Sequence, residues 1–365
     1  MQSDLHYQIA LTLVPHIGDV HAKILAQHFG SAEAIFKARK KDLEAVEGIG
    51  EVRAKSIKNF SDFTSSEAEV QFIEKYKIKP LFVTDPAYPK RLLHCYDSPV
   101  LLFYRGSADL NTSRILAIVG TRNHSDYGKQ FTEKLLEEMQ GQKILILSGL
   151  AFGIDSIAHK AALKNGLPTV GVLAHGLDRI YPVQNKTLAK QMAENGGLLT
   201  DFLSGTNPDK QNFPKRNRIV AGLCDGLLVV ESGKKGGSLI TAELANSYNK
   251  DVFAVPGKTV DTKSEGCNYL IKQNKAVLVT GAEDITTMLG WQSPKKVAAL
   301  QRQLFTELNS DEAVIANLLQ EQASMHIDGL YFKSGLSSSA MAAALLTLEM
   351  KGMVVSMPGK LYKLA

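Results

Sequence analysis

The sequence predicts an α/β fold in which a doubly wound, mainly parallel sheet lies between two small helical domains. From about residue 72 to residue 289, short Val, Ile and Leu runs alternate with helical segments. These runs lack the polar alternation of a strand with one wet face, so they are expected to be buried on both faces, as in a parallel sheet. Residues 1–65 and 306–365 have apolar positions at helical spacing instead. A chain of 365 residues is long enough for two or three domains.

The N-terminal domain is predicted to be entirely helical. Apolar residues recur at helical spacing in three of its segments, residues 9–14, 22–29 and 54–57. Segments 14–31 and 46–60 look like two copies of a helix-hairpin-helix unit, as in a SAM-like domain. The second copy has Gly48 and Gly50, which would let backbone N–H groups approach a DNA phosphate, whereas the first has His16 in place of a glycine. Packing as a protein-contact module is the alternative.

The middle domain, residues 66–290, is predicted to be an extended Rossmann-like domain. Its expected strands are residues 115–119, 144–147, 169–173, 198–201, 227–230, 252–255 and 276–279. A loop, and usually a helix, follows each strand. This order is typical of a doubly wound sheet with helices on both faces.

The C-terminal domain, residues 306–365, follows a predicted linker at residues 291–305 that carries Ser, Pro and paired lysines. Its expected helices are residues 312–320, 327–333 and 338–351. Two short strands around Pro358 and Gly359 complete a pattern that resembles a winged helix. The last helix is mostly apolar and offers one lysine and one glutamate, so contact with a protein and binding of duplex DNA both stay open.

Composition limits the possible classes of protein. The formal net charge is +5, from 42 Lys and Arg against 37 Asp and Glu residues, so any basic surface must be local. Cys95, Cys224 and Cys267 are far apart and form no Cys-x-x-Cys pair, which argues against a disulfide framework or a zinc site and favours the cytoplasm. A signal peptide and a membrane span are not expected, because the sequence has no long apolar run.

Glycine-rich and basic loops follow several of the predicted strands. The carboxyl ends of parallel strands lie at one edge of a sheet, where helix N-termini leave unpaired N–H donors facing a crevice. Arg122, Lys215, Arg216 and Arg218 add positive charge to these loops. A chain of phosphates therefore suits the crevice better than a single nucleotide does. A solvated run of charge is the usual alternative for such a cluster.

Two of these loops invite comparison with nucleotide-binding motifs. The loop at Gly120 and Arg122 lacks a full Gly-x-Gly-x-x-Gly and the acidic residue of a dinucleotide fingerprint, so no nicotinamide cofactor is expected. Arg122 is expected to bind a phosphate through two N–H groups. The segment 234–238, Lys-Lys-Gly-Gly-Ser, lacks the ending of a Walker A loop, so ATP hydrolysis is not supported.

The loop at residues 148–153 combines glycines with an aromatic residue. Phe152 at its tip, like Phe213 further along the chain, is a candidate for stacking on an unpaired base, with packing in the core as the alternative. Asp155 and His159 follow at the i, i+4 spacing of an acid–base couple or half of a metal site. The sequence offers no third ligand at matching spacing. We therefore expect Asp155 to brace the helix and His159 to pack beneath the loop.

An ordered series of motifs, including "IVGTR", "SGLAFGIDSIAH", "FPKRNRIVAGL" and "GGSLITAELA", resembles the DNA-processing protein A family, also called Smf. The resemblance covers roughly residues 82–285. It implies a cytoplasmic protein, not an enzyme and without a cofactor, that binds single-stranded DNA, loads the RecA recombinase during natural transformation and forms homodimers through the Rossmann-like domain. The DNA-contacting residues expected from the loops and the resemblance are Gly120, Thr121, Arg122, Ser148, Gly149, Phe152, Gly153, Phe213, Lys215, Arg216, Asn217, Arg218, Lys235, Gly236, Gly237 and Ser238.

A second family offers an alternative of another class. The Gly-Gly-Ser loop, followed by Thr241 and Glu243, also resembles the loop of Rossmann-like nucleotide phosphoribohydrolases, where a glutamate serves hydrolysis. Here Ser238 stands in place of the longer Gly-Gly-x-Gly-Thr pattern. An isolated Glu243 is therefore expected to be structural.

Overall fold

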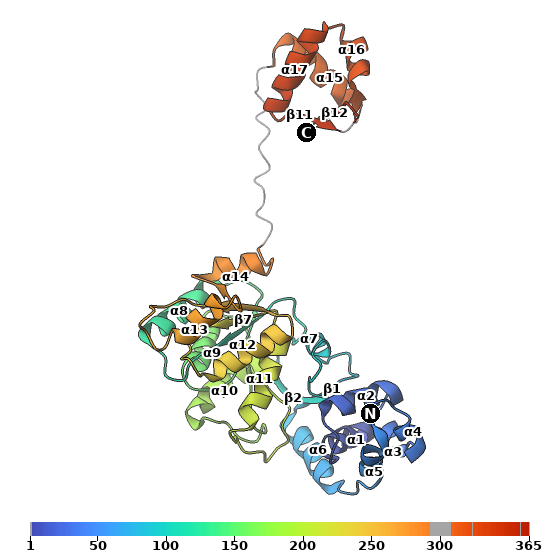
Figure 1. The fold of residues 1–365 in the computed structure, drawn as a ribbon, viewed down its shortest axis with the longest axis vertical. Coiled ribbons are helices and arrows are strands. Elements are labelled where there is room, and N and C mark those ends of the chain that lie inside the picture. The colour runs from blue at the N-terminus through green and yellow to red at the C-terminus, as the bar shows by residue number, and fades with distance from the viewer. Residues whose placement is uncertain (1, 293–307, 323, 358, 365) are drawn as a thin grey trace. The chain divides into compact units, whose positions relative to one another are not determined.

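The computed structural model describes residues 2–292, 308–322, 324–357 and 359–364. The chain divides into two compact units, Met1–Gln292 and Ser293–Ala365 (Figure 1). Apart from its first two positions, the predicted linker at residues 291–305 lies outside the described residues.

The first unit begins with a group of short helices. They are α1 (Gln2–Leu13), α2 (Asp19–Phe29), α3 (Ala32–Lys37), α4 (Lys40–Glu44), α5 (Gly50–Lys58) and α6 (Thr64–Tyr76). Their apolar sides form a core around Leu25 and Ile35 that continues onto Phe82 and Phe103 of the neighbouring sheet. The helices therefore pack directly against one edge of the sheet, and the helical region runs past residue 65, where we predicted a domain boundary.

The two predicted hairpins have related backbone geometry. His16 has a φ of 66° and Gly48 a φ of 82°, so both lie in the left-handed region that glycine adopts most readily. Each hairpin leads into a helix, α2 or α5. The histidine in the first copy thus takes the conformation that glycine has in the second.

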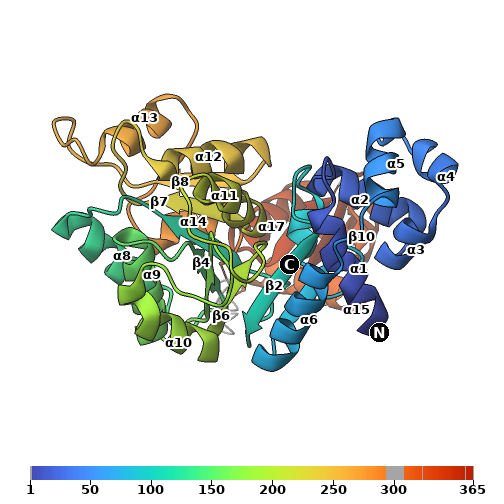
Figure 2. The same cartoon turned by 90° about the horizontal axis from the view of Figure 1, so that it is seen from below.

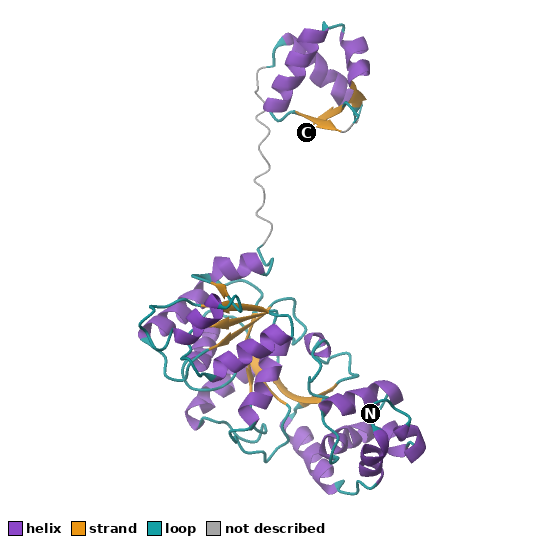
Figure 3. Cartoon of the chain, in the orientation of Figure 1, coloured by secondary structure: helices purple, strands orange, loops and turns teal. Residues whose placement is uncertain are grey.

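A nine-stranded sheet forms the centre of the first unit (Figure 3). Its strands are β1 (Lys79–Phe82), β2 (Leu101–Gly106), β3 (Ile115–Val119), β4 (Leu145–Ser148), β5 (Thr169–Val172), β6 (Gly196–Thr200), β7 (Gly226–Val229), β8 (Asp251–Ala254) and β9 (Val277–Leu278). The spatial order is β1-β2-β6-β5-β4-β3-β7-β8-β9. The seven strands from β6 to β9 are parallel, and β1 and β2 are antiparallel additions at one edge.

Helices cover both faces of the sheet. They are α7 (Lys90–Leu93), α8 (Asp126–Glu138), α9 (Ile154–Lys164), α10 (Lys186–Glu194), α11 (Asn212–Leu223), α12 (Gly237–Ser247), α13 (Glu265–Lys272) and α14 (Ala282–Met288), with a short 3₁₀ turn at Val183–Asn185. Ala117 of β3 faces the core beneath α11 and α12, whereas its neighbour Ile118 faces the core beneath α8 and α9. Figure 2 shows these two helical layers on opposite sides of the sheet. The doubly wound prediction is confirmed.

The C-terminal unit has the winged-helix arrangement that we predicted. Its elements are α15 (Ser310–Glu321), β10 (Met325–His326), α16 (Ile327–Ser334), α17 (Ser338–Met350), β11 (Val354–Met357) and β12 (Leu361–Leu364). The sequence did not reveal β10, which pairs with β12 beside the predicted hairpin. Pro358 of the expected turn lies outside the described residues. Across the described residues of both units, no helix has the length and apolar character needed to cross a membrane.

Candidate functional site

The parallel strands bring three of their following loops to one edge of the sheet. Ala117 of β3 is level with Leu147 of β4, and Ser148 of β4 is level with Gly171 of β5, so the three strands end close together. A hollow with about 360 Å³ of unfilled space, part of it open to solvent, lies at this edge. Its lining includes Arg122, Phe152, His175, Tyr181, Phe213 and Arg216. We call it the α11 cleft, because α11 supplies the last two of these residues.

The loops after β3 and β4 touch each other at Gly153. Its φ is +78°, and a Cβ there would lie 2.2 Å from the Thr121 carbonyl oxygen and 2.6 Å from that of Arg122. The amide of Ile154, the first residue of α9, donates to the same Thr121 oxygen at 3.2 Å. A side chain at position 153 would therefore push away the loop that carries Arg122.

Arg122 lies over an aromatic ring of α11. Its guanidinium carbon is 5.1 Å from the centroid of the Phe213 ring, within the range of a cation–π contact. Tyr181 approaches the same ring, with 6.2 Å between centroids. Arg122, Phe152 and Tyr181 are all exposed, so the rim of the cleft offers one cation and two accessible aromatic rings.

Arg216 forms part of the cleft wall and is 94% buried. Its guanidinium shares the space above Gly149 with the carboxylate of Asp155, since a Cβ on that glycine would lie 2.3 Å from Arg216 Nη1 and 2.5 Å from Asp155 Oδ2. Burial raises the pKa of Asp155, and the positive charge of Arg216 opposes this shift. Arg216 donates to the Val172 carbonyl, while its Nε–H has no hydrogen-bond partner among the described residues.

His159 is fully buried beneath the loop after β4, as we predicted. Its Nε2 lies 2.5 Å from the Gly149 carbonyl oxygen and its Nδ1 lies 2.6 Å from Thr169 Oγ1. A carbonyl oxygen can only accept, so we assign the ring proton to Nε2. Burial lowers the pKa of His159 to about 4, which keeps the ring neutral at pH 7. Asp155 braces the same loop, because its Oδ2 accepts the Ala151 N–H at 3.4 Å.

Several other predicted site residues are engaged within the chain. Ser148 is fully buried and donates to the Ile118 carbonyl at 2.5 Å. Gly120 packs against Ile154, with 2.6 Å between an added Cβ and Ile154 Cγ1. Lys215 on the first turns of α11 is exposed, and Asn217 is half-buried.

Of the predicted site residues, Arg122, Phe152, Phe213 and Arg216 line the α11 cleft. Two groups of the others are engaged elsewhere. Ser238 donates to Ser232 at 2.9 Å, and the residues of its loop, Lys235 to Ser238, do not line the cleft. Arg218 points to another surface, where it pairs with Asp19 and Asp201. The structure therefore brings together the loops after β3 and β4 with the start of α11.

Sequence reasoning missed two residues of this region. Glu231 follows β7, is buried and accepts the Ser125 N–H at 2.9 Å, while its own carbonyl accepts the Thr121 N–H at 2.8 Å. It thereby ties down both ends of the loop that carries Arg122. Tyr181 was the other, although its place in the "VLAHGLDRIYP" motif could have pointed to it.

The residues that would serve a hydrolase are not assembled in the cleft. The Glu243 carboxylate pairs with Lys275 at 2.7 Å on an exposed surface and does not line the cleft. The Thr241 hydroxyl donates to the Gly237 carbonyl of its own helix at 3.2 Å. Within the described residues, no group of three or more His, Cys, Asp or Glu side chains is placed to hold a metal ion.

Comparison with protein families and known proteins gives a consistent result. Residues 79–290 match the family model of DNA recombination-mediator protein A, residues 9–69 match a helix-hairpin-helix motif, and residues 298–360 match the DprA winged helix domain. Protein Smf of a Synechocystis species is 33% identical over 99% of both chains. The X-ray structure of DNA processing protein A from Streptococcus pneumoniae has a TM-score of 0.68 and 34% identity, over 77% of this chain and 97% of that one.

A second solved structure bears on the ligand. DNA processing protein A from Helicobacter pylori, described for its single-stranded DNA binding mode, has a TM-score of 0.54 and 30% identity. The match covers 59% of this chain and 96% of that one.

Proposed function

Because this chain belongs to the DNA recombination-mediator protein A family, also called DNA processing protein A or Smf, we propose that it binds single-stranded DNA in the α11 cleft. The observation that carries the proposal is the convergence of Arg122 and Arg216 with the exposed ring of Phe152 in one cleft. The cations suit a phosphate backbone, and the ring suits an unpaired base. The Helicobacter relative, whose structure concerns single-stranded DNA, supports the same ligand.

The contacts divide into two kinds in this proposal. Arg122 and Lys215 are exposed and bind phosphates through charge, while Arg216 contributes from the wall of the cleft. Phe152 is the exposed ring that stacks on a base, and Phe213, which both Arg122 and Tyr181 approach, is the second candidate. Of the other predicted contacts, those at Gly120, Thr121, Gly149, Gly153 and Asn217 lie on the same loops and on α11 and would add polar groups beside the cleft. Ser148 donates to the Ile118 carbonyl, and Lys235, Gly236, Gly237 and Ser238 do not line the cleft, so these residues are left out of the proposal.

In the cell, this protein would protect incoming single strands and load the RecA recombinase onto them in natural transformation. The family's role as a recombination mediator supports this assignment. Homodimerisation through the Rossmann-like domain and a cytoplasmic location belong to the same proposal. Catalysis is not part of this proposal. Glu243 pairs with Lys275 and does not line the cleft, so its position gives no support to the phosphoribohydrolase alternative.

The experiment that tests the ligand compares single-stranded and duplex DNA of equal length, using the full chain and fluorescence anisotropy. We expect tighter binding of the single strand, because a duplex hides the base faces that Phe152 needs. Phe152→Ala should weaken binding of oligo-dT by about 1–3 kcal/mol per base lost from the stack. An abasic strand provides the control, since its binding should not change in the Phe152→Ala variant. Equal affinity for both DNA forms would contradict the stacking role.

A parallel incubation with purine mononucleotides tests the alternative function. We expect no release of ribose 5-phosphate. Turnover that Glu243→Gln abolishes would instead establish the hydrolase.

A further inference from the structure

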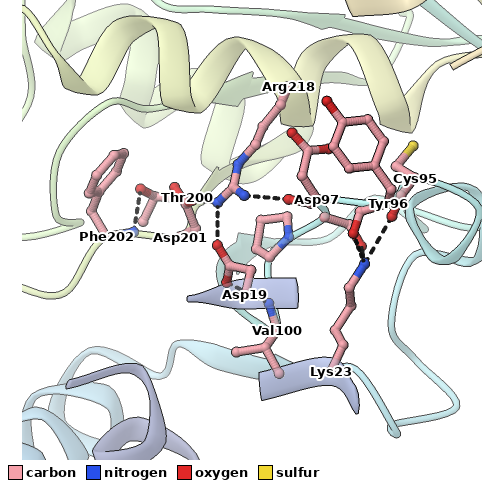
Figure 4. A network of polar contacts seen from close by, with 12 residues as sticks. Asp19, Lys23, Cys95, Tyr96, Asp97, Val100, Thr200, Asp201, Phe202 and Arg218 are labelled. Atoms are coloured by element: carbon pink, nitrogen blue, oxygen red, sulfur yellow. Dashed lines mark hydrogen bonds and ion pairs between the residues drawn. The ribbon is translucent and has the colours of Figure 1, made fainter. Parts of the chain in front are cut away.

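Arg218 lies on the same helix as the proposed DNA ligands but faces the N-terminal helices. Residues two positions apart on a helix point in different directions, so Arg216 reaches the α11 cleft while Arg218 does not. Arg218 Nη2 lies 2.9 Å from Asp19 Oδ2 and 2.7 Å from Asp201 Oδ2. Its Nη1 donates to the Asp97 carbonyl (Figure 4). With its side chain only 16% exposed and two carboxylates bound, Arg218 would have to give up a partner before it could bind a phosphate.

Asp19 connects this arginine to the first hairpin of the N-terminal domain. It is the first residue of α2, and its Oδ1 accepts the Val100 N–H at 3.0 Å. One turn further along α2, Lys23 donates to the Cys95 and Tyr96 carbonyls at 2.9 and 2.7 Å (Figure 4). Both side chains therefore hold α2 on the sheet domain, but of the two only Asp19 forms an ion pair with α11.

The loop that leads into α11 is held by the same N-terminal domain. The Glu69 carboxylate on α6 accepts the Ser204 N–H at 3.1 Å and also the Ser204 hydroxyl. The neighbouring Leu203 packs against the core of the N-terminal helices. Together with the Asp19 contact, this fixes both the approach to α11 and the helix itself.

We propose that Asp19 and Arg218 form a latch through which the N-terminal helices position α11, and with it Lys215 and Arg216, for the DNA backbone. This inference rests on the proposed function. Lys215 lies three residues before Arg218 on the same rigid helix, so a shift or rotation at the latch moves it directly. Arg218 is then a positioning residue, whereas its sequence context alone predicts a fourth phosphate ligand.

Asp19→Asn in the full chain distinguishes the two roles by the sign of the effect. The amide keeps the acceptor for Val100 but removes one of the two negative charges that hold Arg218, while Asp201 remains. If the latch positions α11, affinity for oligo-dT falls roughly three- to thirtyfold, the range for coupling through a packed network. The salt dependence stays the same or becomes flatter, because phosphate contacts of α11 are weakened and none is gained. If Arg218 is instead a ligand restrained by Asp19, its release raises affinity and steepens the salt dependence, so unchanged or higher affinity overturns the proposal.

Lys23→Met supplies the matched control. It removes hydrogen bonds of α2 to Cys95, Tyr96 and Ser98 but no hydrogen bond or ion pair with α11, so thermal stability falls while affinity for oligo-dT stays the same. An equal loss of affinity in Lys23→Met and Asp19→Asn would assign the effect to general docking and overturn the latch. These results are distinguishable from failure of the proposed function, in which case the unmodified chain itself would not bind oligo-dT.

Glu69→Gln keeps the inference testable if Asp19→Asn does not fold. It weakens the hold on Ser204 without touching Arg218. We expect the same direction of change, a loss of oligo-dT affinity without a steeper salt dependence. Full oligo-dT affinity of Glu69→Gln would show that the N-terminal domain does not position α11.

Discussion

Three basic residues of α11, only a few positions apart, have different environments. Lys215 is exposed, Arg216 is buried beside Asp155, and Arg218 pairs with Asp19 and Asp201. Their partners come from segments far away in the chain, so the sequence predicted a basic cluster at this place but not which cation is free. The physical difference is the cost of desolvation, which a buried cation recovers only through fixed acceptors.

Lys215→Met and Arg216→Met should therefore differ in their effect on stability. Replacing Lys215 should change the free energy of unfolding by no more than about 0.5 kcal/mol, as for other exposed positions. Replacing Arg216 removes the positive charge near the buried Asp155 carboxylate and leaves the Val172 carbonyl without this donor, so it should cost about 1–3 kcal/mol. Urea unfolding of the two variants measures the difference. Equal stabilities would show that the charge of Arg216 does not compensate Asp155.

The buried His159 predicts a pH dependence of stability. Its pKa of about 4 in the folded protein lies below the ordinary value of 6.5, so between these values only the unfolded chain takes up the proton. Above pH 6.5 the residue makes no pH-dependent contribution, and as the pH falls towards 4 it destabilises the fold by about 1.4 kcal/mol per pH unit. His159→Gln removes this contribution. Its unfolding free energy should therefore fall less steeply than that of the unmodified chain between pH 6.5 and 4.5, and parallel profiles would contradict the assignment.

At the scale of elements, the seven parallel strands were predictable because each is a short apolar run, and all except the exposed edge strand β9 are mostly buried on both faces. The observed ends of β3 are the predicted ones, and those of the other six strands lie within two residues of the prediction. The antiparallel strands β1 and β2 were missed. Pro80 lies within β1, and a proline weakens a strand prediction except at a sheet edge, which is where β1 lies. The contact of the N-terminal helices with this edge depends on that missed pair.

The loops after β3 and β4 form a single element of the site because they meet at Gly153. Gly153→Ala should displace Thr121 and Arg122 and lower both stability and oligo-dT affinity, since the added Cβ meets backbone atoms. Gly141→Ala is the matched control, with a similar φ of +76° but nothing within 4 Å of the added Cβ. It should lower stability by about 1 kcal/mol from backbone strain alone and leave affinity unchanged. Thermal melts and fluorescence anisotropy on both variants test this prediction. Full oligo-dT affinity of Gly153→Ala would show that the contact between the two loops is not needed for DNA binding.

At the scale of the whole molecule, the cleft lies entirely within the unit Met1–Gln292. The exposed positions of α17 in the other unit, among them Ser338, Ala342, Leu346 and Met350, carry no charge. The exposed positions of this helix therefore offer no cation that could bind a phosphate backbone. A chain that ends at residue 292 should keep the melting transition of the first unit and the oligo-dT affinity of the full chain. A large loss of affinity on truncation would place part of the DNA site in the winged-helix unit.

The central claim is that the exposed cations Arg122, in the α11 cleft, and Lys215, beside it on α11, bind the DNA backbone. The salt dependence of oligo-dT affinity tests this claim most directly. For single strands, the log–log slope is about −0.7 per neutralised phosphate. The double variant Arg122→Met, Lys215→Met should therefore bind more weakly, with a slope flattened by about 1.4. Its melting curve should show a normally folded protein. A double variant that folds normally, keeps full affinity and shows the slope of the unmodified chain would contradict the account.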